Sequence, residues 1–298
     1  MSSLLIIPYL GNVNDSVRLA LSSLLSNSKV EVLFISENEQ KFELDRLKTI
    51  ILTREKLSKL IKDKIEVDVS LEKYYKLCDL KPLYFKIFED YINETEYEYI
   101  GFCDTDVIYG NVDSYIKNVD SDVIGRNGHF MLFNRKAREY ILDVIKLSTT
   151  KFVLESNKCY AFDEFKFLHV YISKLVASND LSWEDKLSIE CVDLDYYSQS
   201  LYCQNRRTEI QEILFDEVGI RVRVNDELAY VPYVHFQKRE MPIDEYKSGL
   251  VISHYGGFFE RLAFRIGAFY RRLISKFYVE SIFRKYYYAK VFESEINE

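Results

Sequence analysis

The chain has 298 residues, enough to bury a sizeable core as one large domain or two small ones. Its apolar content of 48% and charged content of 29% are those of an ordinary globular protein, and only 10 Gly and 4 Pro argue against long disordered linkers. The net charge of −7 is uneven, because residues 258–290 hold eight basic and two acidic side chains. An acidic body without a recognised nucleic-acid-binding motif argues against nucleic acid as a partner.

The cysteines and the N-terminus indicate the compartment. Five cysteines without CxxC spacing fit a reducing environment. The start, MSSLLIIPYLG, has no basic n-region and its apolar run breaks at Pro8, so we expect no signal peptide. No run of about 18 apolar residues occurs, so we expect no membrane-spanning segment. These features predict a cytoplasmic protein.

The first 70 residues alternate between strand and helix patterns. Three apolar runs have the length and setting of buried strands: 4–7, 30–35 and 49–53. Asn14 or Asp15 can cap a helix that runs to about Ser26, and a Lys-rich helix follows from Arg54. This alternation predicts a parallel, doubly wound sheet.

The remaining elements follow in chain order. Residues 71–93 have a helical pattern that Pro82 should break or restart. Further strands are predicted at 97–103, 123–125 and 130–133, a helix at 136–147, and later strands near 189–192 and 220–224.

The stretch EYIGFCDTDVIYGN places two acids, Asp104 and Asp106, directly after an apolar strand. At the carboxyl end of a strand in an open parallel sheet, alternate side chains point the same way and can meet a ligand. Two carboxylates suit a hard cation such as Mg²⁺ or Mn²⁺, although a solvent-facing turn is the plain alternative. Two other D-x-D pairs exist: 120/122 lies in a polar stretch typical of a solvated turn, whereas 193/195 follows an apolar run and is a rival.

Several motifs in a fixed order resemble one family. They are LIIPYLG at 5–11, YKLCDLKPLYFKIFEDYI at 75–92, GFCDTDVIYGNV at 101–112, GHFMLFNR at 128–135, FDE at 162–164 and HFQKR at 235–239. Together they resemble bacterial GT-A glycosyltransferases from capsule and O-antigen gene clusters. The resemblance implies a Rossmann-like, doubly wound mixed sheet over residues 1–257 and a helical, aromatic-rich, basic extension over 258–298.

The resemblance also implies roles for single residues. The cation, Mn²⁺ or Mg²⁺, would be held by Asp104, Asp106 and His235, with His254 as the competitor of His235. The nucleotide-sugar donor, by family habit a UDP-sugar, would contact Pro8, Tyr9, Lys76, Asp79, Lys81, Asp104 and Lys238. Asp163 or Glu164 would be the catalytic base of an inverting transfer, and Gly128 and His129 would line the acceptor or sugar side. The sequence leaves inverting and retaining transfer open.

Plain alternatives exist for these residues. The segment around Lys76, Asp79 and Lys81 also reads as an amphipathic helix with a solvated charged face. Asp163 and Glu164 also read as acids at a helix N-terminus, where they stabilise the dipole.

The tail suggests a location. Apolar residues recur at 262, 266, 269, 273 and 277, and basic side chains flank this stripe at Arg261, Arg265, Arg272 and Lys276. Such a helix can bind an anionic membrane surface, so residues 258–290 predict a peripheral protein on the inner face of the bacterial plasma membrane. The acceptor would then be a glycan or a lipid-linked glycan. The alternative is a helix packed on the body or on a second copy.

Two rival functions are kept open. IGFCDTDVIYG also fits the D-x-D-x-V opening of haloacid-dehalogenase-type phosphatases, in which the first Asp is a nucleophile, but no later GDxxxD-type motif follows. The second rival is a non-enzymatic membrane- or carbohydrate-binding module whose acids bind a structural cation.

Overall fold

The computed structural model describes residues 2–164, 167–194, 201–203, 208–210, 212–216, 218–224, 227–236, 241, 251–252 and 276–297. The strands are β1 (Ser3–Tyr9), β2 (Val30–Ser36), β3 (Leu47–Ile51), β4 (Tyr99–Cys103), β5 (Val107–Tyr109), β6 (Val123–Ile124), β7 (Phe130–Phe133), β8 (Trp183–Glu184), β9 (Val192–Leu194), β10 (Leu201–Cys203), β11 (Thr208–Glu209), β12 (Glu212–Asp216), β13 (Gly219–Val224), β14 (Glu227–Val231), β15 (Tyr233–His235) and β16 (Val251–Ile252). The helices are α1 (Asp15–Leu25), α2 (Arg54–Ile65), α3 (Lys76–Leu80), α4 (Tyr84–Ile87), α5 (Asp113–Ile116), α6 (Arg135–Asp143), α7 (Ser148–Glu155), α8 (Leu168–Ala177), α9 (Lys186–Ile189) and α12 (Lys276–Glu295). Short 3₁₀ turns occur at η1 (Lys81–Leu83), η2 (Glu89–Tyr91), η3 (Glu94–Glu96) and η4 (Val144–Lys146).

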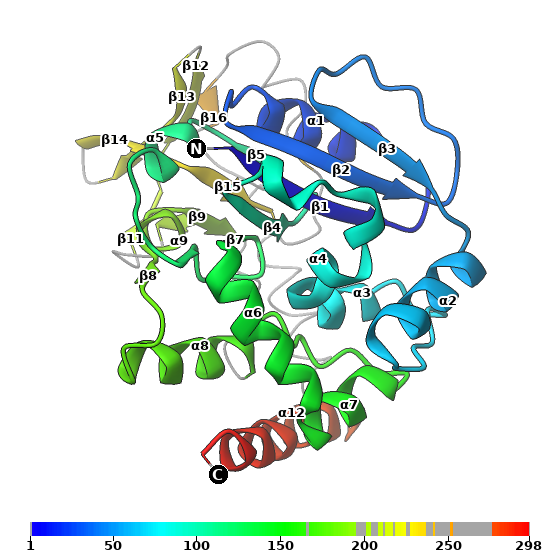
Figure 1. The fold of residues 1–298 in the computed structure, drawn as a ribbon. Coiled ribbons are helices and arrows are strands. Elements are labelled where there is room, and N and C mark those ends of the chain that lie inside the picture. The colour runs from blue at the N-terminus through cyan, green and yellow to red at the C-terminus, as the bar shows by residue number, and fades with distance from the viewer. Residues whose placement is uncertain are drawn as a thin grey trace.

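A seven-stranded sheet in the order β3-β2-β1-β4-β7-β6-β8 forms the centre of the fold (Figure 1). Strand β1 pairs in parallel with both β2 and β4, and β2 pairs in parallel with β3. Strand β7 runs antiparallel to its neighbours β4 and β6. The predicted α/β class and mixed sheet are confirmed.

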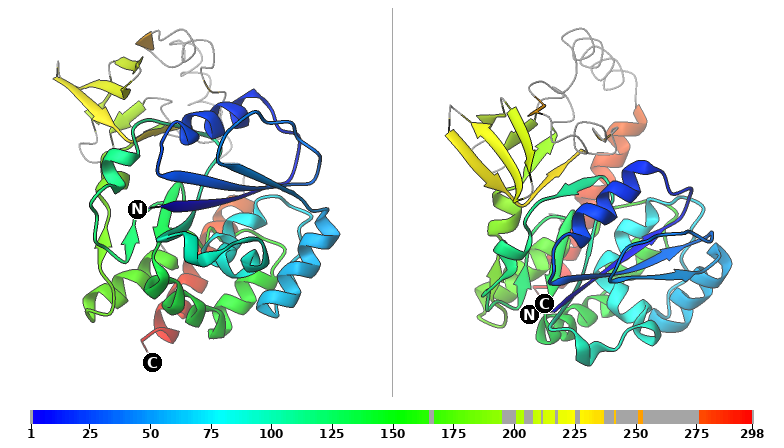
Figure 2. Two further views of the ribbon diagram at one scale, coloured as in Figure 1. Left: turned by 45° about the horizontal axis from the view of Figure 1, so that its top comes forward. Right: turned by 90° about the horizontal axis from the view of Figure 1, so that it is seen from above.

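Helices cover both faces of this sheet because successive side chains of β1 point to opposite faces. Leu4 and Ile6 pack in one apolar core with residues of α2, α4 and α6. Leu5 and Ile7 pack in a second core with residues of α1. Figures 1 and 2 show α1 on one side of β1 and β2, and α2, α3 and α4 on the other.

Two smaller sheets lie beside the large one. The first has the order β11-β10-β9-β15-β5 and the second β14-β13-β12-β16. Helix α1 joins the layers, since Leu19 and Ala20 share a third core with Ile213 and Ile220 of the second small sheet. Figure 2 shows strands β12 to β14 next to α1, away from β3.

Several predicted boundaries were wrong. The third strand is Leu47–Ile51 instead of 49–53, because Thr53 accepts a hydrogen bond from the backbone of Lys56 and caps α2. The predicted helix at 71–93 is a series of short pieces that starts at Lys76, and Pro82 begins a new turn, as its missing N–H favours. The strand predicted near 189–192 starts only at Val192, because 186–189 forms α9.

The C-terminal helix α12 packs on the body. Its residues Ala289 and Phe292, together with Ile296 just after its end, share an apolar core with Val153 of α7 and with Phe162. The carboxylate of Glu295 accepts hydrogen bonds from Ser148 and from the backbone N–H of Thr149 at the start of α7. The described residues 286–297 thus pack on the body, whereas the choice between membrane and packing for the stripe at 262–277 stays a prediction. The predicted boundary at 257/258, His254 and the predicted basic residues Arg261, Arg265 and Arg272 lie outside the described residues.

Among the described helices, none has both the length and the apolar character that crossing a bilayer requires.

Candidate active site

The two acids of the D-x-D motif lie in the connection between β4 and β5, where the backbone is held from two sides. The N–H of Asp104 donates to the carbonyl of His129 over 3.0 Å, and the Tyr109 hydroxyl donates to the carbonyl of Asp104 over 2.7 Å. The carbonyl of Asp106 accepts from the N–H of Phe236 at 2.9 Å. The motif thus sits where the large sheet meets the first small sheet, as its place at a strand end predicts.

Asp104, which is partly exposed, belongs with the buried Lys81 and Asp163 to a group that we call the lysine cluster. The Lys81 Nζ lies 2.7 Å from Asp104 Oδ1, 2.7 Å from Asp163 Oδ2 and 3.0 Å from the Gly128 carbonyl oxygen to which it also donates. Burial acts against the charge of Lys81, but the two carboxylates raise its pKa well above the ordinary value. Burial raises the pKa of Asp163 to about 7, even beside Lys81.

Gly128 makes this close arrangement possible. A Cβ atom at this position would lie 2.3 Å from Asp163 Oδ2 and 3.4 Å from Lys81 Nζ. Any other residue would therefore push the carboxylate or the lysine away.

Asp106 belongs to a different group, which we call the histidine cluster: Asp106, His129, Asp193 and His235. His235 Nδ1 lies 2.9 Å from Asp193 Oδ1, and His235 Nε2 lies 3.5 Å from Asp106 Oδ2. The rings of His129 and His235 are in contact, with centroids 3.6 Å apart and their planes tilted by 36°. Strand pairing sets this up, because β15 places His235 opposite Val107 of β5 and opposite Asp193 of β9.

The pKa values of the two imidazoles in this cluster are shifted in opposite directions. Burial lowers the pKa of His235, but hydrogen bonds and charge from Asp106 and Asp193 outweigh it and raise that pKa to about 10. Burial, helped by the charge of His235, lowers the pKa of His129 to about 4. His129 is therefore neutral at pH 7, the form that can bind a metal.

The donor set fits a divalent cation. Ligand atoms of Asp104, His129 and His235 all lie within 4.8 Å of one another. The Nδ1 atom of His129 is buried and has no hydrogen-bond partner among the described residues. Asp193 stands behind His235, the usual carboxylate support of a metal-binding histidine. Imidazole and carboxylate together favour a transition metal such as Mn²⁺ over Mg²⁺.

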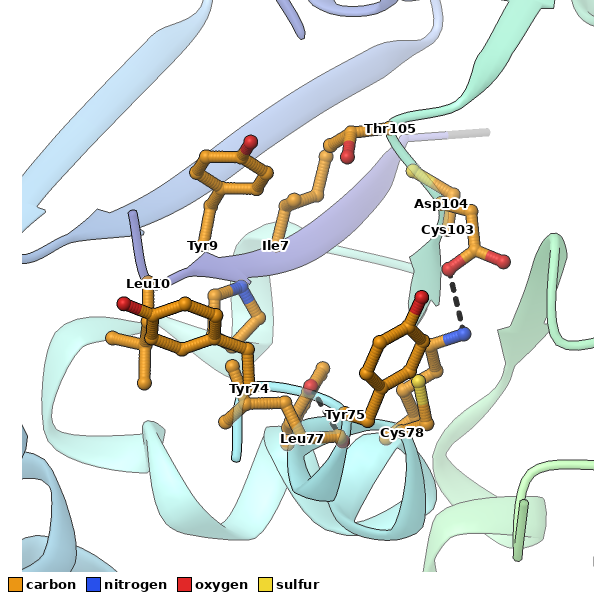
Figure 3. Close-up of a pocket in the computed structure, with 13 residues that line it drawn as sticks. Ile7, Tyr9, Leu10, Tyr74, Tyr75, Leu77, Cys78, Cys103, Asp104 and Thr105 are labelled. Atoms are coloured by element: carbon orange, nitrogen blue, oxygen red, sulfur yellow. Dashed lines mark hydrogen bonds and ion pairs between the residues drawn. The ribbon is translucent and has the colours of Figure 1, made fainter. Parts of the chain in front are cut away.

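A pocket of about 210 Å³ opens beside Asp104 and Lys81. Figure 3 shows Tyr9, Tyr74 and Tyr75 around it and Asp104 paired with the lysine at one end. Its lining comprises Ile7, Pro8, Tyr9, Leu10, Tyr74, Tyr75, Leu77, Cys78, Lys81, Tyr84, Cys103, Asp104 and Thr105. Four of the residues expected to contact the donor are in this lining: Pro8, Tyr9, Lys81 and Asp104.

The other expected donor contacts lie elsewhere. Lys76 and Asp79 are 1% and 0% exposed, form an ion pair of 3.0 Å with each other, and are not among the lining residues. The solvated charged face that the plain alternative gave them is therefore wrong. Lys238 lies outside the described residues.

The two acids expected on the acceptor side differ in exposure. Asp163 is 2% exposed and its Oδ1 atom has no hydrogen-bond partner in the described part of the chain. Glu164, the next residue, is exposed to solvent.

The rival D-x-D pairs can now be placed. Asp122 accepts hydrogen bonds from the backbone and side chain of Ser182 and from Asn134, so it is a structural residue, while Asp120 is exposed. Asp193 is the residue of the site whose role the sequence did not indicate.

Comparisons with known proteins give one family and one solved structure. A family model described as a family of unknown function (DUF6625) matches residues 5–256. Among solved structures, the apo-form glycosyltransferase GlyE of Streptococcus pneumoniae TIGR4 is similar, with a TM-score of 0.35 and 9% sequence identity. The match covers 62% of this chain and 45% of that one, so this chain spans less than half of the length of GlyE. The curated proteins yield no match.

Proposed function

The chain belongs to a family of unknown function (DUF6625), and from the geometry of its site we propose that it is a metal-dependent glycosyltransferase of the GT-A type. In this proposal the donor is a nucleoside-diphosphate sugar. One observation carries it: a pocket with aromatic side chains ends at Asp104 and Lys81, and the ligand atoms of Asp104, His129 and His235 converge there in a set that fits a divalent cation.

The histidine cluster would hold the cation through His235 and His129, together with Asp104 and Asp106. A divalent cation bound there stabilises, as a Lewis acid, the negative charge of a departing diphosphate. Asp193 orients His235 through the 2.9 Å contact with Nδ1. The imidazole of His129 is the group that sequence reasoning assigned to the sugar side, and its unpartnered Nδ1 supports a ligand role instead.

The pocket suits the nucleoside part of a donor. Its volume of about 210 Å³ is below the roughly 300–1,000 Å³ of typical whole-ligand pockets. Tyr9, Tyr74 and Tyr75 offer ring faces and hydroxyl groups to a base and a ribose, and Lys81 brings a fixed positive charge to the end where phosphates would lie.

Asp163 and Glu164 receive different roles in this proposal. Asp163 is buried and paired with Lys81, so it holds the ammonium group that in turn contacts Asp104. Glu164 is exposed, so it is the acid that an acceptor hydroxyl can reach. If the transfer is inverting, Glu164 is the base; a retaining transfer does not need one.

The finer assignments follow from the sequence resemblance alone. The proposed nucleotide is UDP and the proposed acceptor is a glycan or lipid-linked glycan of a bacterial surface polysaccharide. We place the enzyme in the cytoplasm, with the basic residues of 258–290 on the inner face of the plasma membrane.

Ligand-dependent stabilisation tests the proposal. We expect UDP with Mn²⁺ to raise the Tm more than UDP or Mn²⁺ alone, since a ligand at 100 times its Kd stabilises by about 2.7 kcal/mol. GDP and CMP serve as controls for the base. The proposal is wrong if no nucleotide stabilises the chain in the presence of Mn²⁺ or Mg²⁺. Turnover of p-nitrophenyl phosphate would favour the phosphatase, and stabilisation by sugar or lipid without nucleotide would favour the binding module.

A further inference from the structure

The side of helix α3 that faces away from the pocket carries a carboxylate to which the proposed function gives no role. Leu77 and Cys78 of this helix line the pocket, whereas Asp79 is completely buried behind them. A buried carboxylate is costly unless its oxygens are satisfied, so its partners show what it does.

Besides the ammonium group of Lys76 and the thiol of Cys159, the partners of Asp79 are backbone groups of a single loop. Its Oδ1 accepts from the N–H groups of Tyr160 and Phe162, each over 3.0 Å, and its Oδ2 lies 3.1 Å from the Tyr160 nitrogen. Between them Ala161 has a φ of 55°, in the left-handed region that residues other than glycine rarely adopt. Successive N–H groups around such a residue form a concave anion site, and Asp79 fills it.

Lys76 extends the same contact along the chain. Its ammonium group donates to Asp79, to the carbonyl of Val153 and to the carbonyl of Lys158. The segment from the end of α7 to Phe162 has no strand partner among the described residues, so these two side chains satisfy its backbone instead.

The next residue of that loop is part of the site. Asp163 follows Phe162 directly and contacts Lys81, which lies two residues after Asp79. The segment 79–81 therefore holds residues 160–163 at two points: Asp79 holds the backbone and Lys81 holds the Asp163 side chain. The second point also fixes Asp104, because the same Nζ contacts both carboxylates.

We propose that Asp79 is a positioning residue: it fixes the loop 160–163, and through Asp163 and Lys81 it sets where Asp104 lies at the end of the pocket. The inference rests on the proposed function, since it assigns Asp79 to the binding of the metal and nucleotide. Replacing a buried ion pair by apolar residues of similar volume is often neutral for stability. This pair differs from an isolated ion pair, because it also bonds the backbone of the loop at Val153, Lys158, Tyr160 and Phe162, so its removal acts on the placement of the loop.

The experiment compares a variant that removes the pair with the parent chain. Asp79→Asn alone leaves Lys76 buried without its partner and is prone to misfold. The double variant Lys76→Met with Asp79→Leu removes both charges and keeps an apolar core. We expect it to fold, to bind UDP with Mn²⁺ about 10- to 100-fold more weakly, and to exchange the amide hydrogens of Tyr160 and Phe162 faster. Amides of β4 should exchange as in the parent. Asp79→Glu, which keeps a carboxylate, should recover part of the affinity.

A matched control removes a lysine that has two carboxylate partners outside the pocket. Lys64 pairs with Glu89 and Asp90, and none of the three lines the pocket. Lys64→Met should leave the affinity for UDP with Mn²⁺ unchanged.

The possible failures are distinguishable. If the parent binds UDP with Mn²⁺ and the folded double variant binds it equally tightly, Asp79 is not a positioning residue. Unchanged protection of the Tyr160 and Phe162 amides in the double variant would also overturn the inference, by showing that the loop does not depend on Asp79. A parent chain that binds no nucleotide overturns the proposed function, and with it the binding role of Asp79.

Discussion

The lysine cluster and the histidine cluster neutralise the two acids of one D-x-D motif by different means. Asp104 faces Lys81, a permanent cation that has donors and no free electron pair for a metal. Asp106 faces His235, whose ring can give up its proton and bind a metal with the same nitrogen. One acid is thus held by a fixed part of the protein and the other by an exchangeable charge. The motif is therefore asymmetric: its two residues are chemically identical, but their partners differ.

The largest expected effect comes from removing the fixed cation. Lys81→Met leaves Asp163, which is 2% exposed, without its counterion. Breaking a buried pair in this way costs about 3–5 kcal/mol of unfolding free energy, measurable by urea denaturation. Adding Asp163→Leu should recover most of that loss, since no buried charge is then unpaired. A single variant as stable as the parent would show that the lysine cluster is not buried as described.

The next effect concerns the exchangeable side. Asp106→Asn removes a carboxylate that faces His235, and we expect roughly 100-fold weaker binding of Mn²⁺ with UDP with the fold intact, together with loss of transfer. Isothermal titration calorimetry measures the affinity. Asp120→Asn is the matched control, because Asp120 is the exposed acid of another D-x-D pair of the same chain. Equal affinity in both variants, or full turnover by Asp106→Asn, would remove the motif from the site.

The sequence predicted those features that depend on neighbouring residues. Strands β1 and β2 and helix α1 follow from local apolar periodicity and from the cap at Asn14. The family resemblance placed Tyr9 and Lys81 near the acids, and both line the pocket beside Asp104.

What the sequence could not show depends on pairing between distant segments. Asp193 looked like a rival of Asp106, but the parallel pairing of β9 with β15 places it behind His235, 42 residues further along the chain. Lys76 and Asp79 are charged, as residues that contact a ligand often are. Only the path of the loop at 153–162 shows that they bond the backbone of that loop instead. Local periodicity carries no information about either arrangement.

A smaller effect is expected when the lysine cluster is changed by a steric clash instead of by the loss of a charge. Gly128→Ala adds a Cβ atom 2.3 Å from Asp163 Oδ2, and overpacking of this kind costs about 1–3 kcal/mol. Combining it with Asp163→Ala removes the clash, so the two changes should be less destabilising together than their sum. Denaturation of the four proteins in this cycle gives the coupling. Strict additivity would mean that Gly128 does not limit the approach of Asp163.

The smallest expected effect is on the pH dependence of stability, and it comes from a histidine outside both clusters. Among the described histidines, His169 alone lies outside the histidine cluster; it is half-buried, packs against the Trp183 ring at 4.8 Å, and burial together with the nearby charge of Arg126 lowers its pKa to about 4. Between that value and the ordinary 6.5, the unfolded chain binds more protons than the folded one, so stability falls as the pH is lowered through this window. His169→Gln removes this contribution and should flatten the loss of stability between about pH 6.5 and 4, as followed by urea denaturation at several pH values. If the parent and the variant lose the same amount of stability in this window, the acid sensitivity comes from other groups. The groups of the two clusters would then be tested first.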